Sequence, residues 1–130
     1  MLTVILAIGR EILRGRVQDT NSWTLARRLT GLCHEVVRIA ACDDDLVAIV
    51  REVRRAAEDG ATLVVTTGGL GPTDDDRTLQ ALADATDCPL ALHPEARDLV
   101  AARYEALART GAVADGGMTA PREKMAWIPV

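Results

Sequence analysis

The sequence is poor in aromatic residues: its 130 residues include no phenylalanine, one tyrosine and two tryptophans. No row of aromatic side chains is therefore present on which the bases of a single-stranded nucleic acid would stack. Positive charge is also in deficit, because 15 lysines and arginines stand against 19 aspartates and glutamates. The resulting net charge of −4 repels a phosphate backbone, so we expect no nucleic acid among the partners of this chain.

Cysteine is scarce as well, and Cys33, Cys42 and Cys88 show neither CxxC spacing nor an accompanying pair of histidines. This pattern predicts reduced thiols and argues against a disulfide framework or a zinc site. No apolar run reaches the length that spans a membrane, and the strand-like start after Met1 lacks the pattern of a signal peptide. We therefore expect a cytoplasmic protein with no membrane partner.

Short apolar runs alternate with segments of helical period, the pattern of repeated strand-helix units around a mostly parallel sheet. The length suits one domain. The strands predicted from these runs cover residues 2–8, 35–41, 61–67, about 89–92 and 126–130. The run at 61–67 is almost continuously apolar, which predicts a central strand with both faces covered.

The intervening segments predict four helices. They start at Asp19 or Thr20, after the acids at 43–45, at Asp75 or Asp76, and at Pro94. Helical spacing predicts these inward-facing side chains: Trp23, Ala26, Leu29 and Leu32 in the first helix, and Ala96, Leu99, Val100, Leu107 and Ala108 in the last.

The most informative segment follows the third strand and reads Thr67-Gly68-Gly69-Leu70-Gly71-Pro72-Thr73. In open α/β sheets, ligands bind at the carboxyl ends of strands, where helix N-termini present unpaired amides. Glycines let backbone N–H groups approach an anion, and Pro72 stiffens the turn. The segment matches neither a P-loop nor the dinucleotide-binding spacing. We interpret it as a phosphate cradle; the alternative is a plain strand-to-helix turn that tolerates glycine.

Three acids, Asp74, Asp75 and Asp76, follow this segment. Helix capping and solvated surface explain many such runs. Beside an anion-binding loop, however, a divalent cation that bridges carboxylate and phosphate would relieve the repulsion between them. We therefore expect a metal site at Asp75 and Asp76. Asp43, in a similar run after the second strand, is a weaker candidate because one acid of that run caps a helix.

A second loop, at residues 9–21, also follows a strand and should lie at the same edge of the sheet. The two loops read Gly9-x-Glu11-x-x-x-Gly15-x-x-x-Asp19-Thr20-Asn21 and Thr67-Gly68-Gly69-Leu70-Gly71-Pro72-Thr73-x-Asp75-Asp76-x-Thr78. In this order and at this separation they resemble the molybdopterin-binding-type domain, in its CinA-like (competence-damage-inducible protein) branch. The resemblance covers nearly the whole chain.

This resemblance implies a three-layer α/β/α fold over residues 1–130 as a single domain, and a tendency to form homo-oligomers. MogA-like and MoaB-like members of the wider family adenylylate molybdopterin with magnesium and ATP. CinA-like members are associated with hydrolysis of ADP-ribose at its pyrophosphate. The resemblance therefore implies Mg²⁺ and a small phosphorylated ligand, either a nucleotide or molybdopterin. Hydrolysis of ADP-ribose, adenylylation of molybdopterin, and binding without chemistry all stay open.

By motif position, the resemblance implies catalytic and metal-binding roles for Asp75 and Asp76, and a metal-binding role for Asp43. The ligand-binding residues expected in the two loops are Gly9, Glu11, Gly15, Asn21, Thr67, Gly68, Gly69, Gly71, Pro72 and Thr73. There are departures: Arg10 stands where a small or acidic residue is usual, and Cys42 replaces a glycine before Asp43. Family members continue past the segment that resembles residues 122–129 into a glycine-rich loop, so we expect the chain to be a truncated domain.

Overall fold

Strand β1 (Leu2–Ile8) is the central strand of the sheet, and its residues from Thr3 to Ile8 are almost completely buried. The computed structural model describes residues 1–130. In it, β1 pairs in parallel with β2 (Glu35–Cys42) on one side and with β3 (Leu63–Thr67) on the other. The predicted α/β fold with a mostly parallel sheet is confirmed.

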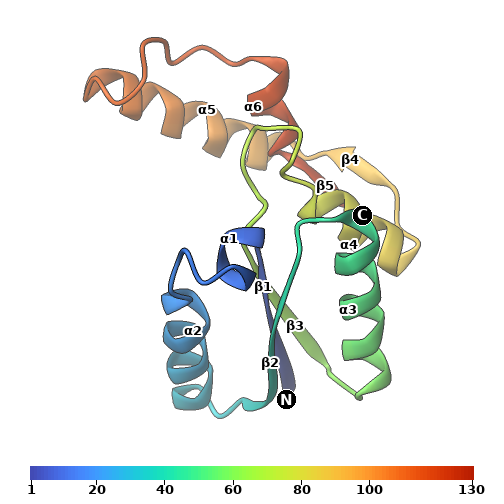
Figure 1. Cartoon of the computed structure of the whole chain (residues 1–130). Helices are drawn as coiled ribbons and strands as arrows, with labels where there is room; N and C mark the ends of the chain where they lie inside the picture. Colours follow the sequence, from blue (N-terminus) through green and yellow to red (C-terminus); the bar gives the residue numbers. More distant parts are fainter.

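Helices cover both faces of this sheet (Figure 1). Helix α2 (Thr20–Gly31) lies on one face, and α3 (Leu46–Glu58) and α4 (Thr78–Thr86) pack side by side on the other. Side chains alternate along a strand, so Val4, Leu6 and Ile8 all point toward one face. There they form the hydrophobic core with these residues of β2, α3 and α4: Cys42, Ile49, Val53, Ala56 and Ala81.

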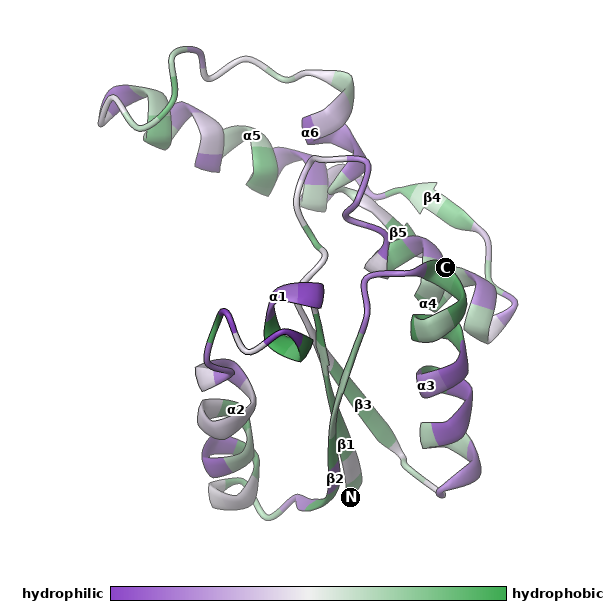
Figure 2. Cartoon of the chain, viewed as in Figure 1, coloured by the Kyte–Doolittle hydropathy of each residue, from purple (hydrophilic) through white to green (hydrophobic).

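The remaining elements form a separate group beyond the carboxyl ends of the strands (Figure 1). β4 (Leu90–Leu92) and β5 (Trp127–Pro129) pair antiparallel, and α5 (Pro94–Arg109) contacts the short α6 (Ala120–Lys124). Figure 2 shows that hydrophobic residues concentrate in β1 and β3, whereas α5 carries a large share of hydrophilic residues. None of the helices combines the length and the hydrophobicity that crossing a membrane requires.

The prediction that residues 61–67 form a central strand is wrong. Strand β3 pairs only with β1 and is an edge strand of the three-stranded sheet, whereas β1 holds the central position. A continuous apolar run indicates that both faces of a strand are at least partly covered, and all residues of β3 are indeed half-buried. The run does not indicate whether a strand pairs with one neighbour or with two.

The buried face predicted for α2 is also partly wrong, because Trp23 is 61% exposed and Leu32 is 70% exposed. A series of side chains spaced by three residues drifts around the helix, since one turn takes about 3.6 residues. The two ends of the series therefore lie on opposite sides. The residues that pack inward are Ser22, Leu25, Ala26 and Leu29.

Two further expectations about helices need correction. Helix α4 begins at Thr78 and not at Asp75 or Asp76, because those acids belong to the preceding loop. In α5 no residue is fully buried, and Leu99 is 67% exposed. Helical spacing identifies an apolar stripe, but α5 has little in this chain to pack the stripe against. The loop at residues 9–21 also contains an unpredicted short helix, α1 (Arg10–Leu13).

Replacing leucine by alanine should affect stability differently in the core at β1 and on the surface of α5. Leu6→Ala removes a fully buried side chain between the sheet and α3, and should lower the free energy of unfolding by roughly 2–5 kcal/mol. Leu99→Ala, at an exposed position, should change it by no more than about 0.5 kcal/mol. Urea unfolding followed by circular dichroism measures both. Equal losses in the two variants would contradict this description of the core.

Candidate functional site

The two loops identified from the sequence meet at the carboxyl edge of the sheet. Because β1 and β3 are parallel and Ala7 lies opposite Thr67, the segments that follow the two strands start side by side. The Asn21 side-chain amide donates a hydrogen bond to the Thr67 hydroxyl, with 2.9 Å between Nδ2 and Oγ1. The amide of Gly9 donates to the carbonyl of Cys42 at 3.0 Å and so fixes the start of the first loop beside β2.

A small cavity lies where these loops touch. It has a volume of about 140 Å³, and its lining includes Glu11, Asn21, Thr67 and Gly68. This is below the roughly 300–1,000 Å³ that is typical of a ligand pocket. Gly15, also predicted to bind ligand, does not line the cavity; it has a φ of 64° and provides the turn after α1.

Glycine is required at the first two positions of the loop from Gly68 to Thr73. Gly68 and Gly69 have φ values of 99° and 62°, in the left-handed region that other residues rarely adopt. A Cβ on Gly68 would lie 2.0 Å from the carbonyl oxygen of Ile8, and one on Gly69 would lie 2.4 Å from the hydroxyl oxygen of Thr78. The glycines thus allow a tight approach to β1 and α4.

Thr78 holds the carbonyl groups of this loop. Its hydroxyl, on a side chain with no exposed surface, donates to the carbonyl of Gly68 at 2.9 Å, and its amide donates to the carbonyl of Gly69 at 3.2 Å. The amides of Gly68, Gly69 and Leu70 donate no hydrogen bond to another backbone group. Free amides after a strand and before a helix are the groups that bind anions. In the sequence, Thr78 is only the last residue of a motif, so this role was missed.

Asp76 closes the loop on its other side. Its carboxylate oxygen Oδ2 accepts from the Thr73 amide at 3.0 Å and from the Thr73 hydroxyl at 2.6 Å. Partial burial raises the pKa of Asp76, but the hydrogen bonds from Thr73 and Gly71 and the charge of Lys124 outweigh this effect, so its pKa is lowered. Asp76 is therefore held ionised as a brace of the loop. Pro72, in the same turn, is half-buried.

The three acids predicted to bind metal have different surroundings. Asp75 is exposed, Asp76 faces Thr73, and Asp43 pairs with Arg10. No group of three or more histidine, cysteine, aspartate or glutamate side chains in the chain is arranged to hold a metal ion. A magnesium ion at this edge would therefore need ligand phosphate oxygens and water in addition to one or two carboxylates, which is its usual coordination in phosphate sites.

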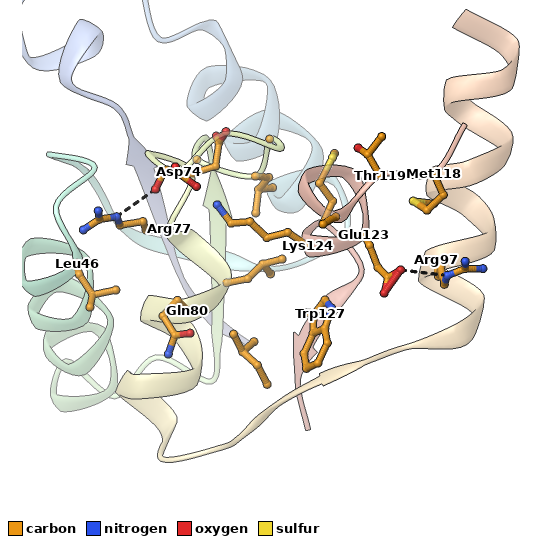
Figure 3. Close-up of a pocket in the computed structure, with 18 residues that line it drawn as sticks. Leu46, Asp74, Arg77, Gln80, Arg97, Met118, Thr119, Glu123, Lys124 and Trp127 are labelled. Atoms are coloured by element: carbon orange, nitrogen blue, oxygen red, sulfur yellow. Dashed lines mark hydrogen bonds and ion pairs between the residues drawn. The ribbon is translucent and has the colours of Figure 1, made fainter. Parts of the chain in front are cut away.

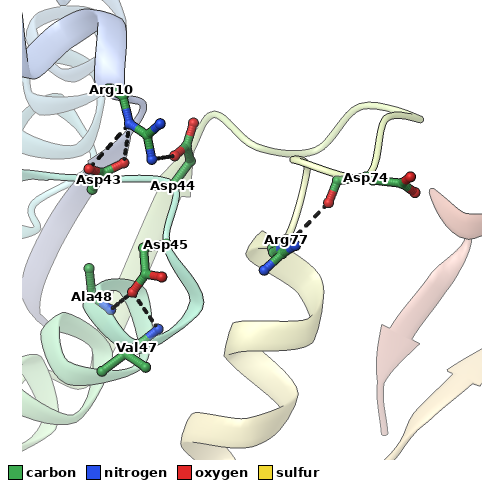
Figure 4. A network of polar contacts seen from close by, with 8 residues as sticks. All are labelled: Arg10, Asp43, Asp44, Asp45, Val47, Ala48, Asp74 and Arg77. Carbon is green, nitrogen blue, oxygen red and sulfur yellow. Dashed lines mark hydrogen bonds and ion pairs between the residues drawn. The ribbon is translucent and has the colours of Figure 1, made fainter.

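Arg10 binds two acids at the end of β2 (Figure 4). Its Nε lies 3.0 Å from Oδ1 of Asp43, and its Nη2 lies 3.1 Å from Oδ1 of Asp44. The pKa of Asp43 is lowered, first by its hydrogen bond with the Asp44 carboxyl and then by Arg10, despite an opposing effect of burial. The same hydrogen bond, together with burial, raises the pKa of Asp44. The two neighbouring carboxyls therefore titrate as an interacting pair.

A larger cavity, of about 800 Å³, lies on the α4 side of the loop and has the size of a ligand pocket (Figure 3). Gly69, Gly71 and Asp76 belong to its lining. The rest of the lining is mixed in character and comes from the end of the loop and from α4, β4, α5, α6 and β5 or their ends. It includes the basic residues Arg77, Arg97 and Lys124, the acids Asp74 and Glu123, and the apolar residues Leu79, Leu90 and Trp127.

Lys124 joins this cavity to the loop, since its ammonium group donates to the carbonyl of Thr73. On the far side, Arg97 pairs with Glu123 at 3.6 Å. Neither basic residue was predicted as part of the site. The sequence gives only a weak indication of this contact. Lys124 lies in the segment 122–129, which resembles the family, but it is 51 positions away from Thr73 in the chain, so no local pattern links the two residues.

Comparison with known proteins gives consistent matches. Residues 4–128 match the model of a family described as "Probable molybdopterin binding domain". A CinA-like protein of Thermomicrobium roseum is 44% identical over 106 residues, which are 82% of this chain and 26% of that protein. The curated relatives that the chain matches are longer proteins, of which it spans between about a quarter and a half.

Two solved structures extend these matches. The CinA structure from Thermoplasma acidophilum, described as of unknown function, has a TM-score of 0.83 and 33% identity, covering 99% of this chain and 71% of that one. The molybdopterin biosynthesis enzyme MoaB from Thermus thermophilus has a TM-score of 0.63 and 26% identity, covering 78% of this chain and 62% of that one.

The contact between Asp76 and Thr73 predicts a pH-dependent loop. Because the folded pKa of Asp76 is lowered, ionised Asp76 stabilises the loop at neutral pH. This contribution is lost as the pH falls from about 4 through the lowered pKa. Thr73→Val removes the hydroxyl donor and should raise the pKa of Asp76, as measured by an NMR titration of its carboxyl carbon. The same pKa in Thr73→Val and wild type would show that the hydroxyl does not brace the loop.

Proposed function

Since the chain belongs to the molybdopterin-binding domain family, we propose that it binds a phosphorylated ligand, a nucleotide or a molybdopterin, at the loop from Gly68 to Thr73. The observation that carries this proposal is the hydrogen bonding of Thr78, which ties the loop carbonyls to α4 while the amides of Gly68, Gly69 and Leu70 have no backbone acceptor. A phosphate oxygen supplies the acceptors that these amides lack.

The cavity on the α4 side supports a ligand with a ring attached to its phosphate. Leu79, Leu90 and Trp127 give it apolar surface suited to a planar base or pterin, and Arg77 and Lys124 add positive charge near the loop. In this proposal the loop amides hold the phosphate group, and the apolar wall receives the ring. Asn21 and Glu11, across the loop in the smaller cavity, would orient the phosphate end.

We propose Mg²⁺ as the accompanying cation, with Asp75 and Asp76 as its protein ligands. Asp75 suits this role because its carboxylate is exposed beside the loop, and Asp76 because it is held ionised. When bound, such a cation would neutralise phosphate charge and polarise the phosphoryl group. Asp76 would keep its contacts with Thr73 and thereby position the loop.

Two enzymatic activities are candidates for this ligand site. The first is adenylylation of molybdopterin, which the likeness to a molybdopterin biosynthesis enzyme supports. The second is hydrolysis of the pyrophosphate of ADP-ribose. The observation in its favour is Asp75, the additional acid of the CinA-like motif, whose side chain is exposed beside the loop.

The formation of homo-oligomers stays a prediction from the family resemblance.

Calorimetric titration tests the binding proposal, with ATP, ADP-ribose and molybdopterin as ligands, each with and without Mg²⁺. Product analysis of the same mixtures separates the activities. AMP and ribose 5-phosphate from ADP-ribose indicate the hydrolase, adenylylated molybdopterin indicates the transferase, and affinity without product indicates a binding module. Binding of none of these ligands, in the presence or absence of magnesium, would overturn the proposal.

Shared coordination predicts that cation and nucleotide bind cooperatively. Mg²⁺ should raise nucleotide affinity at least about tenfold, or about 1.4 kcal/mol, and the nucleotide should raise Mg²⁺ affinity by the same factor. Asp75→Asn should abolish most of this coupling. Without metal it should bind nucleotide as well as wild type or better, because it removes repulsion. Asp74→Asn, in the same acidic run, is the matched control. Full coupling in Asp75→Asn would exclude this carboxylate as a metal ligand.

A further inference from the structure

Arg10 is placed beside Asp43 by the pairing of two strands. Ile8 and Cys42 lie opposite each other at the ends of β1 and β2, so the residues that follow these strands are neighbours. The guanidinium Nε lies 3.0 Å and 3.3 Å from the two carboxylate oxygens of Asp43. Its Nη2 lies 3.1 Å from Asp44 (Figure 4). A single side chain of α1 thus contacts both acids.

These contacts use the oxygens that a cation at Asp43 would need. Both oxygens of Asp43 face Nε, and Asp44 faces Nη2. The third acid of the run, Asp45, accepts from the amides of Val47 and Ala48 at 3.0 and 3.1 Å and caps α3. Each of the three acids therefore has a partner within the chain. A divalent cation brought to Asp43 would also be repelled by the guanidinium charge.

We propose that Arg10 is a built-in cation that takes the place of a divalent metal at Asp43 and Asp44. Asp43, to which the family resemblance gives a metal-binding role, then holds no metal in this chain. Any Mg²⁺ beside the loop from Gly68 to Thr73 would depend on Asp75 and Asp76, and only this last statement rests on the proposed function. Arg10 is a positioning and specificity residue: it fixes the charge at the end of β2 without an exchangeable ion.

Binding of Mn²⁺ alone, measured by calorimetry and by the electron paramagnetic resonance signal of the free ion, tests this inference. Arg10→Ala should bind Mn²⁺ at least about tenfold more tightly than wild type, because two carboxylates lose their counter-ion. Adding Asp43→Asn to Arg10→Ala should remove this gain. Asp43→Asn by itself should leave the Mn²⁺ affinity of the wild type unchanged.

Two matched controls separate the ion pair from a general effect of charge. Arg10→Lys keeps a positive charge at this position but loses the forked contacts, so its gain in Mn²⁺ affinity should be smaller than that of Arg10→Ala. Arg28→Ala removes one positive charge from an exposed site on α2 and should leave Mn²⁺ affinity unchanged.

Two results would overturn the inference: Mn²⁺ affinity unaltered by Arg10→Ala, or lost in Asp43→Asn. The second keeps Arg10 in place, so it decides the question even if Arg10→Ala folds poorly. No nucleotide is present in these titrations, so they succeed or fail separately from the proposed function.

Discussion

The hydrogen bonds that Thr78 donates to the carbonyls of Gly68 and Gly69 are the constraint on which the loop from Gly68 to Thr73 depends. They turn the carbonyl groups toward α4, so the amides of the loop are left without backbone partners. The core fixes the same geometry from below: Ile8, at the end of the buried strand β1, leaves no room for a side chain on Gly68. The loop thus continues directly from the sheet, which suits the phosphate binding that we propose for it.

The aspartates at 43–45 and 74–76 occur in similar runs in the sequence, but they make different contacts in the structure. Asp76 braces the loop through Thr73, Asp45 caps α3, and Asp43 and Asp44 neutralise Arg10. Asp75 is exposed and has no hydrogen-bond or ion-pair partner among the side chains described above. The edge is therefore less negative in effect than its two runs of aspartate suggest. The larger cavity beside it is balanced in charge, because Arg77, Arg97 and Lys124 line it together with Asp74, Asp76 and Glu123.

The sequence was informative wherever a local pattern decides the structure. The apolar run of β1, the cap of α2 at Asp19 or Thr20, the cap of α3 by one acid of the run 43–45, and the meeting of two loops at one sheet edge all follow from patterning, helix capping and parallel strand order. It was misleading where tertiary packing decides, as for Trp23 on α2 or the edge position of β3. The pairing of Arg10 with Asp43 depends on the register between β1 and β2, and the contact of Lys124 with Thr73 joins residues 51 positions apart. No short motif encodes such contacts.

The central claim is that free amides of the loop bind phosphate because Thr78 holds the carbonyls away. The most direct measurement is an NMR titration of ¹⁵N-labelled protein with inorganic pyrophosphate, comparing wild type with Thr78→Val. Thr110→Val is the control, because its hydroxyl also donates to a backbone carbonyl but lies at the end of α5. The account predicts that the largest shifts in wild type and in Thr110→Val fall on the amides of Gly68, Gly69 and Leu70. Affinity should be about fivefold weaker in Thr78→Val, the equivalent of roughly one hydrogen bond. Shifts confined to other parts of the chain, or undiminished affinity in a folded Thr78→Val protein, would contradict it.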